Sequence, residues 1–345
     1  MTTRPLPPVR DDWPALNDEA LLDVRFCELG LDLENSWLEP RLAQIDKELA
    51  GKGVRFRPHF WLSTEWFSPD GVPGVAIPFY LAHPRLIQLE RSQMLEVEGG
   101  DHEWCMEILR HEVGHAVDNA YELRRRRRRS RLFGRPSTPY PESYIPRPYS
   151  RKFVLHLDGW YAQSHPDEDF AETFAVWLTP GSGWRERYRG WPALRKLEYM
   201  EELMREIAPL APRVTTRRTV ERLRRRRSTL RRHYARQRAK RGVDYPRFSD
   251  RDLRRLFSDA AEHKQNRKAS RVIHRIRRDV RRLVAEWTGL YQYTIDRIIE
   301  DMIDRCDELN LRLRYAEDRT KLDFTMLVTV QTMNHLHSGL HRVVL

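Results

Sequence analysis

The stretch ILRHEVGHAVDNAY, residues 108–121, constrains the fold more than any other, because it places two histidines and a glutamate on an amphipathic helical pattern. The pattern predicts a helix over residues 101–121, with an apolar stripe at Trp104, Ile108, Val113 and Val117. Residues i and i+4 lie one above the other on a helix, so His111 and His115 can bind one metal ion from the same face. A second element must then supply the remaining ligands.

The segment SHPDEDFAETFAVWL, residues 164–178, predicts that second element. Ser164 is a candidate N-cap, a proline suits the first helical position, and acidic residues crowd the first turn. Glu168 and Glu172 have the same four-residue spacing as the histidines. Glu168 can complete a His, His, Glu ligand set, while Glu172 can accept the free N–H of a liganding histidine and fix its tautomer. The alternative for both is an acidic first turn favoured by the helix dipole.

HEVGHAVDNAY followed by YAQSHPDEDFAETFA resembles the gluzincin metallopeptidases, most of all the catalytic centre of anthrax lethal factor and bacterial zinc-binding metallopeptidases. The resemblance covers two short segments only. It implies that His111, His115 and Glu168 bind Zn²⁺, that Glu112 is the general base, and that Glu172 is a supporting carboxylate.

A tyrosine seven residues before the ligand glutamate assists at the oxyanion or leaving group in that pattern, and the matching residue is Tyr161. An ordinary interfacial tyrosine beside Trp160 is the alternative. The implied enzyme is a zinc-dependent peptidase acting on a peptide or protein substrate. Bound zinc would lower the pKa of its water towards about 7, and Glu112 would take the proton. The rival is a nucleic-acid- or protein-binding protein with a non-catalytic zinc site, which needs no general base.

The region before the histidine helix predicts a small, mostly antiparallel sheet. GVRFRPHFWLS (53–63) and GVPGVAIPFYLAH (71–83) are rich in β-branched and aromatic residues, and RLIQLE (85–90) is a candidate third strand. Pro78 favours an edge position for the second strand, where an extended peptide could pair with Gly74–Leu81. With the two helices, this predicts an α+β, zincin-like catalytic domain over residues 1–212.

Residues 213–345 predict a separate, all-α basic domain. They hold 34 Lys or Arg and 17 Asp or Glu, whereas the whole chain has a net charge of +12, so residues 1–212 are net negative. The arginine-rich part, residues 213–282, suggests three alternatives: a nucleic-acid partner, an acidic protein partner, or a solvated helical surface.

The remaining sequence features concern the surroundings of the candidate site, the state of the cysteines and the cellular compartment. Residues 124–151 read as an Arg- and Pro-rich loop that could shield the site, with the run Arg124–Arg129 most simply solvated. Asp118 is either an acceptor behind the metal ligands or a solvated residue, and His165 is more simply a cap or surface residue than part of a cleft. Three scattered cysteines without a CxxC motif predict buried thiols. No apolar run or signal-like amino terminus appears, which predicts a cytoplasmic protein without membrane partners.

Overall fold

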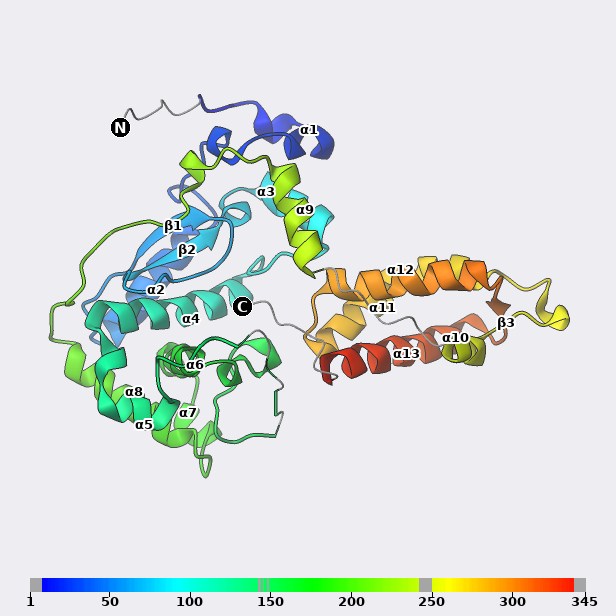
Figure 1. The fold of residues 1–345 in the computed structure, drawn as a ribbon. Coiled ribbons are helices and arrows are strands. Elements are labelled where there is room, and N and C mark those ends of the chain that lie inside the picture. The colour runs from blue at the N-terminus through cyan, green and yellow to red at the C-terminus, as the bar shows by residue number, and fades with distance from the viewer. Residues whose placement is uncertain (1–7, 142–143, 145, 148, 242–249, 338–345) are drawn as a thin grey trace. The chain divides into compact units, whose positions relative to one another are not determined.

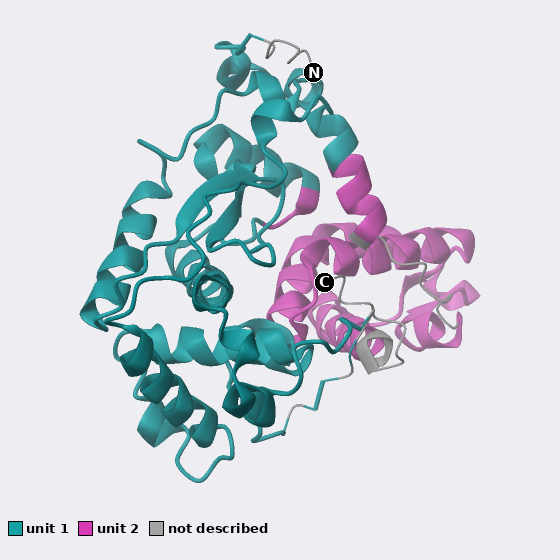
Figure 2. Cartoon of the chain, turned by 60° about the vertical axis from the view of Figure 1, so that its left-hand side comes forward, with its two compact units in different colours: residues 1–93, 97–233, 345 teal, residues 94–96, 234–344 magenta. Residues whose placement is uncertain are grey.

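The computed structural model describes residues 8–141, 144, 146–147, 149–241 and 250–337. Helices predominate among these residues, and the strands are few and short (Figure 1). Contacts between backbone positions divide the chain into two units (Figure 2). Unit 1 comprises residues 1–93 and 97–233, and unit 2 comprises residues 94–96 and 234–344.

Residues 213–233, expected in the basic helical domain, belong instead to unit 1. Backbone pairing with earlier segments holds them there: Arg213 donates its N–H to the Ala120 carbonyl at 2.8 Å, and Phe26 donates to the Ser228 carbonyl at 3.2 Å. The change in charge near residue 212 reflects surface composition, whereas backbone hydrogen bonds determine which unit a segment joins. The boundary therefore lies about twenty residues later than composition suggested.

The helices of unit 1 cover a two-stranded sheet. Helix α4 contacts strand β2 on one side and helix α6 on the other (Figure 1). The helices before residue 212 are α1 (Asp18–Leu22), α2 (Glu39–Gly51), α3 (Pro84–Met94), α4 (His102–Tyr121), α5 (Arg127–Phe133), α6 (Pro166–Leu178), α7 (Trp184–Arg187) and α8 (Leu194–Ile207). Helix α9 (Leu230–Arg241) continues from unit 1 into unit 2.

The sheet of unit 1 differs from the expected antiparallel one. Strands β1 (His59–Ser63) and β2 (Gly74–Pro78) are parallel, with His59 opposite Gly74. Phe67, in the connection between them, bridges β2 in antiparallel fashion and exchanges both backbone hydrogen bonds with Ala76. The connection thus folds back along β2, and it occupies at Ala76 the edge that we expected an extended peptide to join.

The expected third strand, residues 85–90, is wrong, because these residues lie in helix α3. Leu86 and Leu89 are both fully buried, and their spacing of three fits one face of a helix. A strand would have placed them on opposite faces of the sheet. Pro84 occupies the first helical position, where the missing N–H costs nothing.

Unit 2 is predominantly helical, as expected, but its described residues also include a short antiparallel pair of strands. Its helices are α10 (Asp250–Leu256), α11 (Ala269–Thr288), α12 (Gln292–Glu308) and α13 (Glu317–His337), and its strands are β3 (Phe257–Ser258) and β4 (Arg312–Leu313). Helices α11, α12 and α13 pack on one another around an apolar core that includes Ile273, Val280, Ile299, Met302, Phe324 and Val328. Unit 2 thus has a core of its own.

Two expectations about the surroundings can be compared with the fold. Cys27, Cys105 and Cys306 are all buried free thiols, as predicted from their scatter. Within the described part of the chain, every helix is either too short or too polar to cross a lipid bilayer.

Candidate metal centre

Helix α4 carries the two histidines, and its ends follow from the sequence. Asp101 is the N-cap, and its carboxylate accepts the N–H of Trp104 at 2.9 Å. The helix ends where Glu122 adopts a left-handed conformation with φ of 52°. Almost every residue beyond the first turn is buried, including both histidines and Glu112. Burial of these polar groups requires partners from other elements.

Helix α6 supplies those partners. Pro166 is its first residue, and acidic residues follow in the first turn, as predicted. The cap is His165 rather than Ser164: His165 Nδ1 accepts the N–H of Asp167 at 3.1 Å, and His165 Nε2 bonds to the Thr138 carbonyl at 2.8 Å. Of the cap and surface roles that we expected for His165, the structure shows the cap.

The two helices approach closely where they cross. A Cβ atom on Gly114 would lie 3.0 Å from Ala171 Cα and 3.1 Å from Phe174 Cδ1, closer than ordinary van der Waals contact. Glycine in α4 facing alanine in α6 thus allows the two backbones to come together. This close approach brings the acidic first turn of α6 within reach of the histidines on α4.

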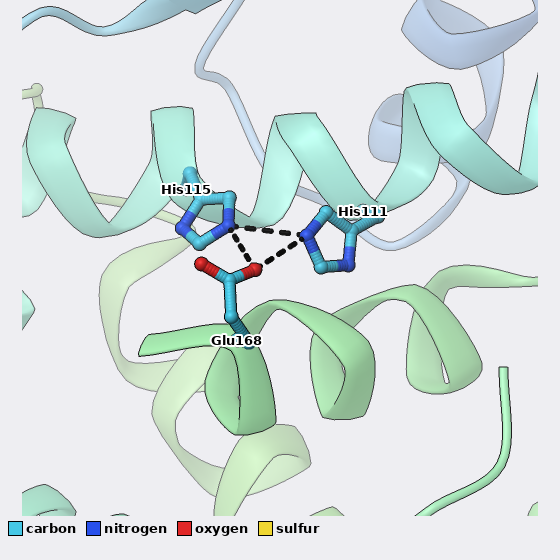
Figure 3. A group of neighbouring side chains, drawn as sticks. All are labelled: His111, His115 and Glu168. Atoms are coloured by element: carbon cyan, nitrogen blue, oxygen red, sulfur yellow. Dashed lines mark hydrogen bonds and ion pairs between the residues drawn. The ribbon is translucent and has the colours of Figure 1, made fainter. Parts of the chain in front are cut away.

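The three expected ligands converge (Figure 3). Glu168 Oε2 lies 3.0 Å from His111 Nε2 and 3.1 Å from His115 Nε2, and the two Nε2 atoms are 3.2 Å apart. Ligands of a tetrahedral zinc ion at about 2.0–2.1 Å from the metal would be about 3.3 Å from one another. The three donor atoms therefore form one triangular face of the size that such an ion requires. This group could hold a metal ion.

The second carboxylate of α6 orients one of the histidines. His111 Nδ1 donates to Glu172 Oε1 at 2.8 Å, which leaves Nε2 facing Glu168. The other oxygen of Glu172 accepts the backbone N–H of Leu157 at 3.0 Å. Glu172 is fully buried and satisfied on both oxygens, so it fixes the ring of His111 with its Nε2 lone pair directed to the centre.

The electrostatics of the centre favour positive charge. Burial alone would lower the pKa of His111, but its hydrogen bonds to Glu168 and Glu172 outweigh burial and raise it to about 10. Burial likewise opposes ionisation of Glu168, yet the charge of His115 and the hydrogen bonds from both histidines hold the pKa of this carboxyl well below its usual range. A bound cation would replace the protons that the histidines otherwise attract.

The acidic residues on either side of Glu168 also indicate that the centre favours a positive charge. Asp167, Glu168 and Asp169 are consecutive and all buried. Arg129 Nη2 lies 2.7 Å from Asp167 Oδ1, and Lys196 Nζ lies 2.5 Å from Asp169 Oδ2. The outer two carboxylates thus each have a cationic side chain, whereas the middle one faces the imidazole pair. Buried carboxylates need a compensating cation, and a metal ion bound by the imidazoles would supply it here.

Glu112 and Tyr161 lie beside this group. Glu112 is buried, and burial raises the pKa of its carboxyl against the charges of His115 and His111. Its Oε2 atom has no hydrogen-bond partner among the described residues. The ring of Tyr161 lies 5.5 Å from that of His111, centroid to centroid. Burial and the charges of Glu168 and Glu112 raise the pKa of Tyr161 well above its usual value, so the hydroxyl stays protonated and can donate.

Tyr140 contacts the centre, although we did not single it out in the sequence. Its hydroxyl donates to Glu168 Oε1 at 2.8 Å, the oxygen that the histidines leave open. Its ring stacks on His165, with centroids 3.7 Å apart and planes at 15°. Tyr140 belongs to the Arg- and Pro-rich segment 124–151, so part of this segment lies against the candidate centre. No local sequence pattern indicates this role, because Tyr140 and Glu168 are 28 residues apart and meet only in the fold.

The arginine run is not simply solvated. Residues Arg127–Phe133 form helix α5, and Arg129 is fully buried. Its Nη2 atom lies 2.7 Å from both Asp118 Oδ2 and Asp167 Oδ1, so it ties α4 to α6. Asp118, expected either behind a metal ligand or in solvent, is instead buried against Arg129 and Arg124. Arg129 and Arg124 thus form ion pairs with buried acids, whereas Arg125, Arg127 and Arg128 of the same run are exposed.

A comparison with protein-family models, curated proteins and solved structures finds no match to this chain.

Proposed function

We propose that the chain is a zinc-dependent peptidase, with His111, His115 and Glu168 as the metal ligands and unit 1 as a zincin-like catalytic domain. The observation that carries this proposal is the triangle of donor atoms with sides of 3.0, 3.1 and 3.2 Å. Two imidazoles and one carboxylate are the ligand set of catalytic zinc sites, in which the fourth position remains for water or substrate. Bound zinc would supply a Lewis acid and an acidified water molecule.

The residues of the chain have separate tasks in this reaction. Glu112, adjacent to the ligands and raised in pKa by burial, accepts the proton of the attacking water and passes it to the leaving amine. Tyr161 donates its hydroxyl hydrogen to the oxyanion that develops on the peptide carbonyl. Glu172 keeps the ring of His111 in one orientation through the 2.8 Å hydrogen bond to Nδ1.

The position of Glu112 favours an enzyme over a binding protein with a structural zinc site. A structural site completes its coordination with a fourth protein ligand and has no use for a base. Among the described residues, the group with metal-binding geometry has three members, and a buried, incompletely satisfied carboxylate stands next to it. Leaving such a group unpaired costs about 1–3 kcal/mol or more, which a catalytic role would justify.

The test compares wild type with Glu112→Gln, His115→Ala and, as a matched control on the same helix, Glu103→Gln, whose side chain is exposed. Zinc content is measured by elemental analysis, and cleavage of a mixed peptide library is followed by mass spectrometry. We expect one zinc in all but His115→Ala, and loss of cleavage of roughly 10²-fold or more in Glu112→Gln. Stoichiometric zinc with no cleavage by wild type would favour the binding protein, and absence of zinc from wild type would refute the metal site itself.

A further inference from the structure

A cationic hollow lies in unit 2, and none of its lining residues belongs to the candidate metal centre. Its volume is about 570 Å³. Five of its eight lining residues are Lys or Arg, and none is acidic. The lining residues are Gln265, Asn266, Arg267, Lys268, Arg271, Val272, Arg275 and Arg312.

Backbone pairing holds the walls of this hollow in place. The segment before α11 runs beside β4, where Lys268 and Arg312 form an antiparallel bridge. Leu313 donates its N–H to the Arg267 carbonyl at 3.0 Å, and Asn266 Nδ2 donates to the Leu313 carbonyl at 2.8 Å. The cationic side chains therefore project from fixed backbone rather than from an unsupported loop.

Two of the five cations share one acidic partner from outside the hollow. Arg267 and Arg275 both form ion pairs with Glu317 at the start of α13. One carboxylate thus faces two guanidinium groups, and this part of the hollow keeps an excess of positive charge.

The other three cations have no acidic partner in the part of the chain that the structure describes. Lys268 and Arg271 form no ion pair there, and Arg312 donates only to the carbonyl of Asn266 at 3.2 Å. Helix α11 begins at the hollow, and no side chain caps its N-terminus. The partial positive charge of the helix end adds to the three side chains, so the hollow attracts anions.

We propose that this hollow binds phosphate groups of a nucleic-acid strand. Planar guanidinium groups match phosphate in geometry and charge. Arginines follow one face of α11 from Arg271 and Arg275 in the hollow to Arg278 and Arg282 beyond it. These positions extend over eleven residues, about 16 Å of helix, which is enough to follow a strand past more than one phosphate. The proposal is independent of the peptidase activity.

The lining favours a strand over the other anionic ligands. Sites for small molecules are mostly apolar and enclose the ligand, whereas Val272 is the only apolar lining residue here and most of the cations are exposed. Protein partners bind through buried aromatic or aliphatic anchors, and a hollow lined by one valine has no such pocket. Contacts to a sugar-phosphate backbone need neither feature.

The test uses the full-length chain and a fluorescein-labelled single-stranded DNA of twenty nucleotides, with binding followed by anisotropy between 50 and 200 mM NaCl. The variant is Lys268→Gln/Arg271→Gln/Arg312→Gln. The charge-matched control is Arg185→Gln/Arg187→Gln/Arg189→Gln, which changes three exposed arginines in and beside α7 of unit 1. Three lost phosphate contacts should make the negative slope of log affinity against log salt shallower by roughly 2 in the variant, and the control should keep the wild-type slope. Circular dichroism checks that both variants fold. If the triple variant does not fold, Arg271→Gln alone replaces it, and this variant should make the slope shallower by about 0.7.

Several results would overturn the proposal. One is the absence of binding by wild type at 50 mM salt, and another is an equal loss of affinity in variant and control. Competition by polyglutamate as strongly as by unlabelled DNA at equal charge would point to an acidic protein partner instead. Binding of a nucleoside monophosphate with no binding of the strand would point to a small phosphorylated ligand.

Discussion

Replacement of Gly114 by alanine probes whether the approach of α4 to α6 builds the metal centre. The new Cβ would lie 3.0 Å from Ala171 Cα and 3.2 Å from the Ala171 carbonyl oxygen, whereas ordinary contacts begin near 3.4 Å. Because these Ala171 atoms belong to the backbone of α6, the contact can be relieved only if α6 as a whole moves by a few tenths of an ångström. Alanine favours the helix by about 1 kcal/mol, and overpacking costs about 1–3 kcal/mol, so we expect a net loss of stability of about 0–2 kcal/mol.

The effect on the metal should exceed the effect on the fold. Glu168 lies one helical turn from Ala171, so movement of α6 lengthens the separations of 3.0 and 3.1 Å between its Oε2 and the two Nε2 atoms. Metal–ligand distances tolerate only about 0.2 Å of change. Because loss of an orienting partner alone lowers metal affinity about 10–100-fold, we expect zinc affinity to fall at least tenfold.

Zinc affinity is measured by competition with a chromophoric chelator, and stability of the metal-free protein by urea unfolding. Gly51→Ala is the matched control, because Gly51 lies at the end of α2 and a Cβ atom added to it would meet nothing within 4 Å. It should leave zinc affinity unchanged and stabilise the protein by up to about 1 kcal/mol. If Gly114→Ala behaves like Gly51→Ala in both assays, the close crossing does not set the geometry of the centre.

Three further predictions concern the surroundings of the centre. Arg129→Met should lower the free energy of unfolding by up to about 3–5 kcal/mol, because Asp118 and Asp167 lose the buried guanidinium group that they share and keep only the more exposed Arg124. Arg128→Met, which removes an exposed ion pair, should cost less than about 1 kcal/mol, and equal urea midpoints for the two variants would refute this. Tyr140→Phe removes the 2.8 Å hydrogen bond to Glu168, so it should weaken zinc binding about tenfold and shift the d–d absorption spectrum of the Co²⁺-substituted protein. If both the spectrum and the zinc affinity stay unchanged, Tyr140 does not position Glu168. Zinc at 100 times its dissociation constant should stabilise wild type by about 2.7 kcal/mol in urea unfolding and leave His115→Ala unaffected. Stabilisation of both proteins would locate the zinc elsewhere.

The sequence predicted the elements whose pattern is local. The helix over residues 101–121 and the helix over residues 164–178 have periodic apolar faces and end signals, and both formed within a residue or two of the expected bounds. The convergence of His111, His115 and Glu168 was also predictable, because four-residue spacing on two helices and the preferences of metal ligands leave few alternatives.

The features that sequence reasoning missed depend on contacts between distant segments. The segment 85–90 is too short for its periodicity to distinguish a strand from a helix. The parallel pairing of β1 with β2 depends on how the connection between them folds back. Arg129 and Arg124 differ from the exposed arginines of the run because Asp118 and Asp167, from other elements, face them. Tyr140 lies 28 residues before its partner Glu168 in an irregular segment, where spacing carries no geometric information.

The buried charges connect the fold of unit 1 to its proposed chemistry. Asp167 pairs with Arg129 from α5 and Asp169 with Lys196 from α8, so α6 is held on both sides by buried ion pairs. Between them, Glu168 is left with imidazole nitrogens, which are neutral when they bind a metal. The first turn of α6 therefore carries one more buried negative charge than the protein's permanent cations neutralise. A divalent ion at the imidazole pair would supply the missing positive charge.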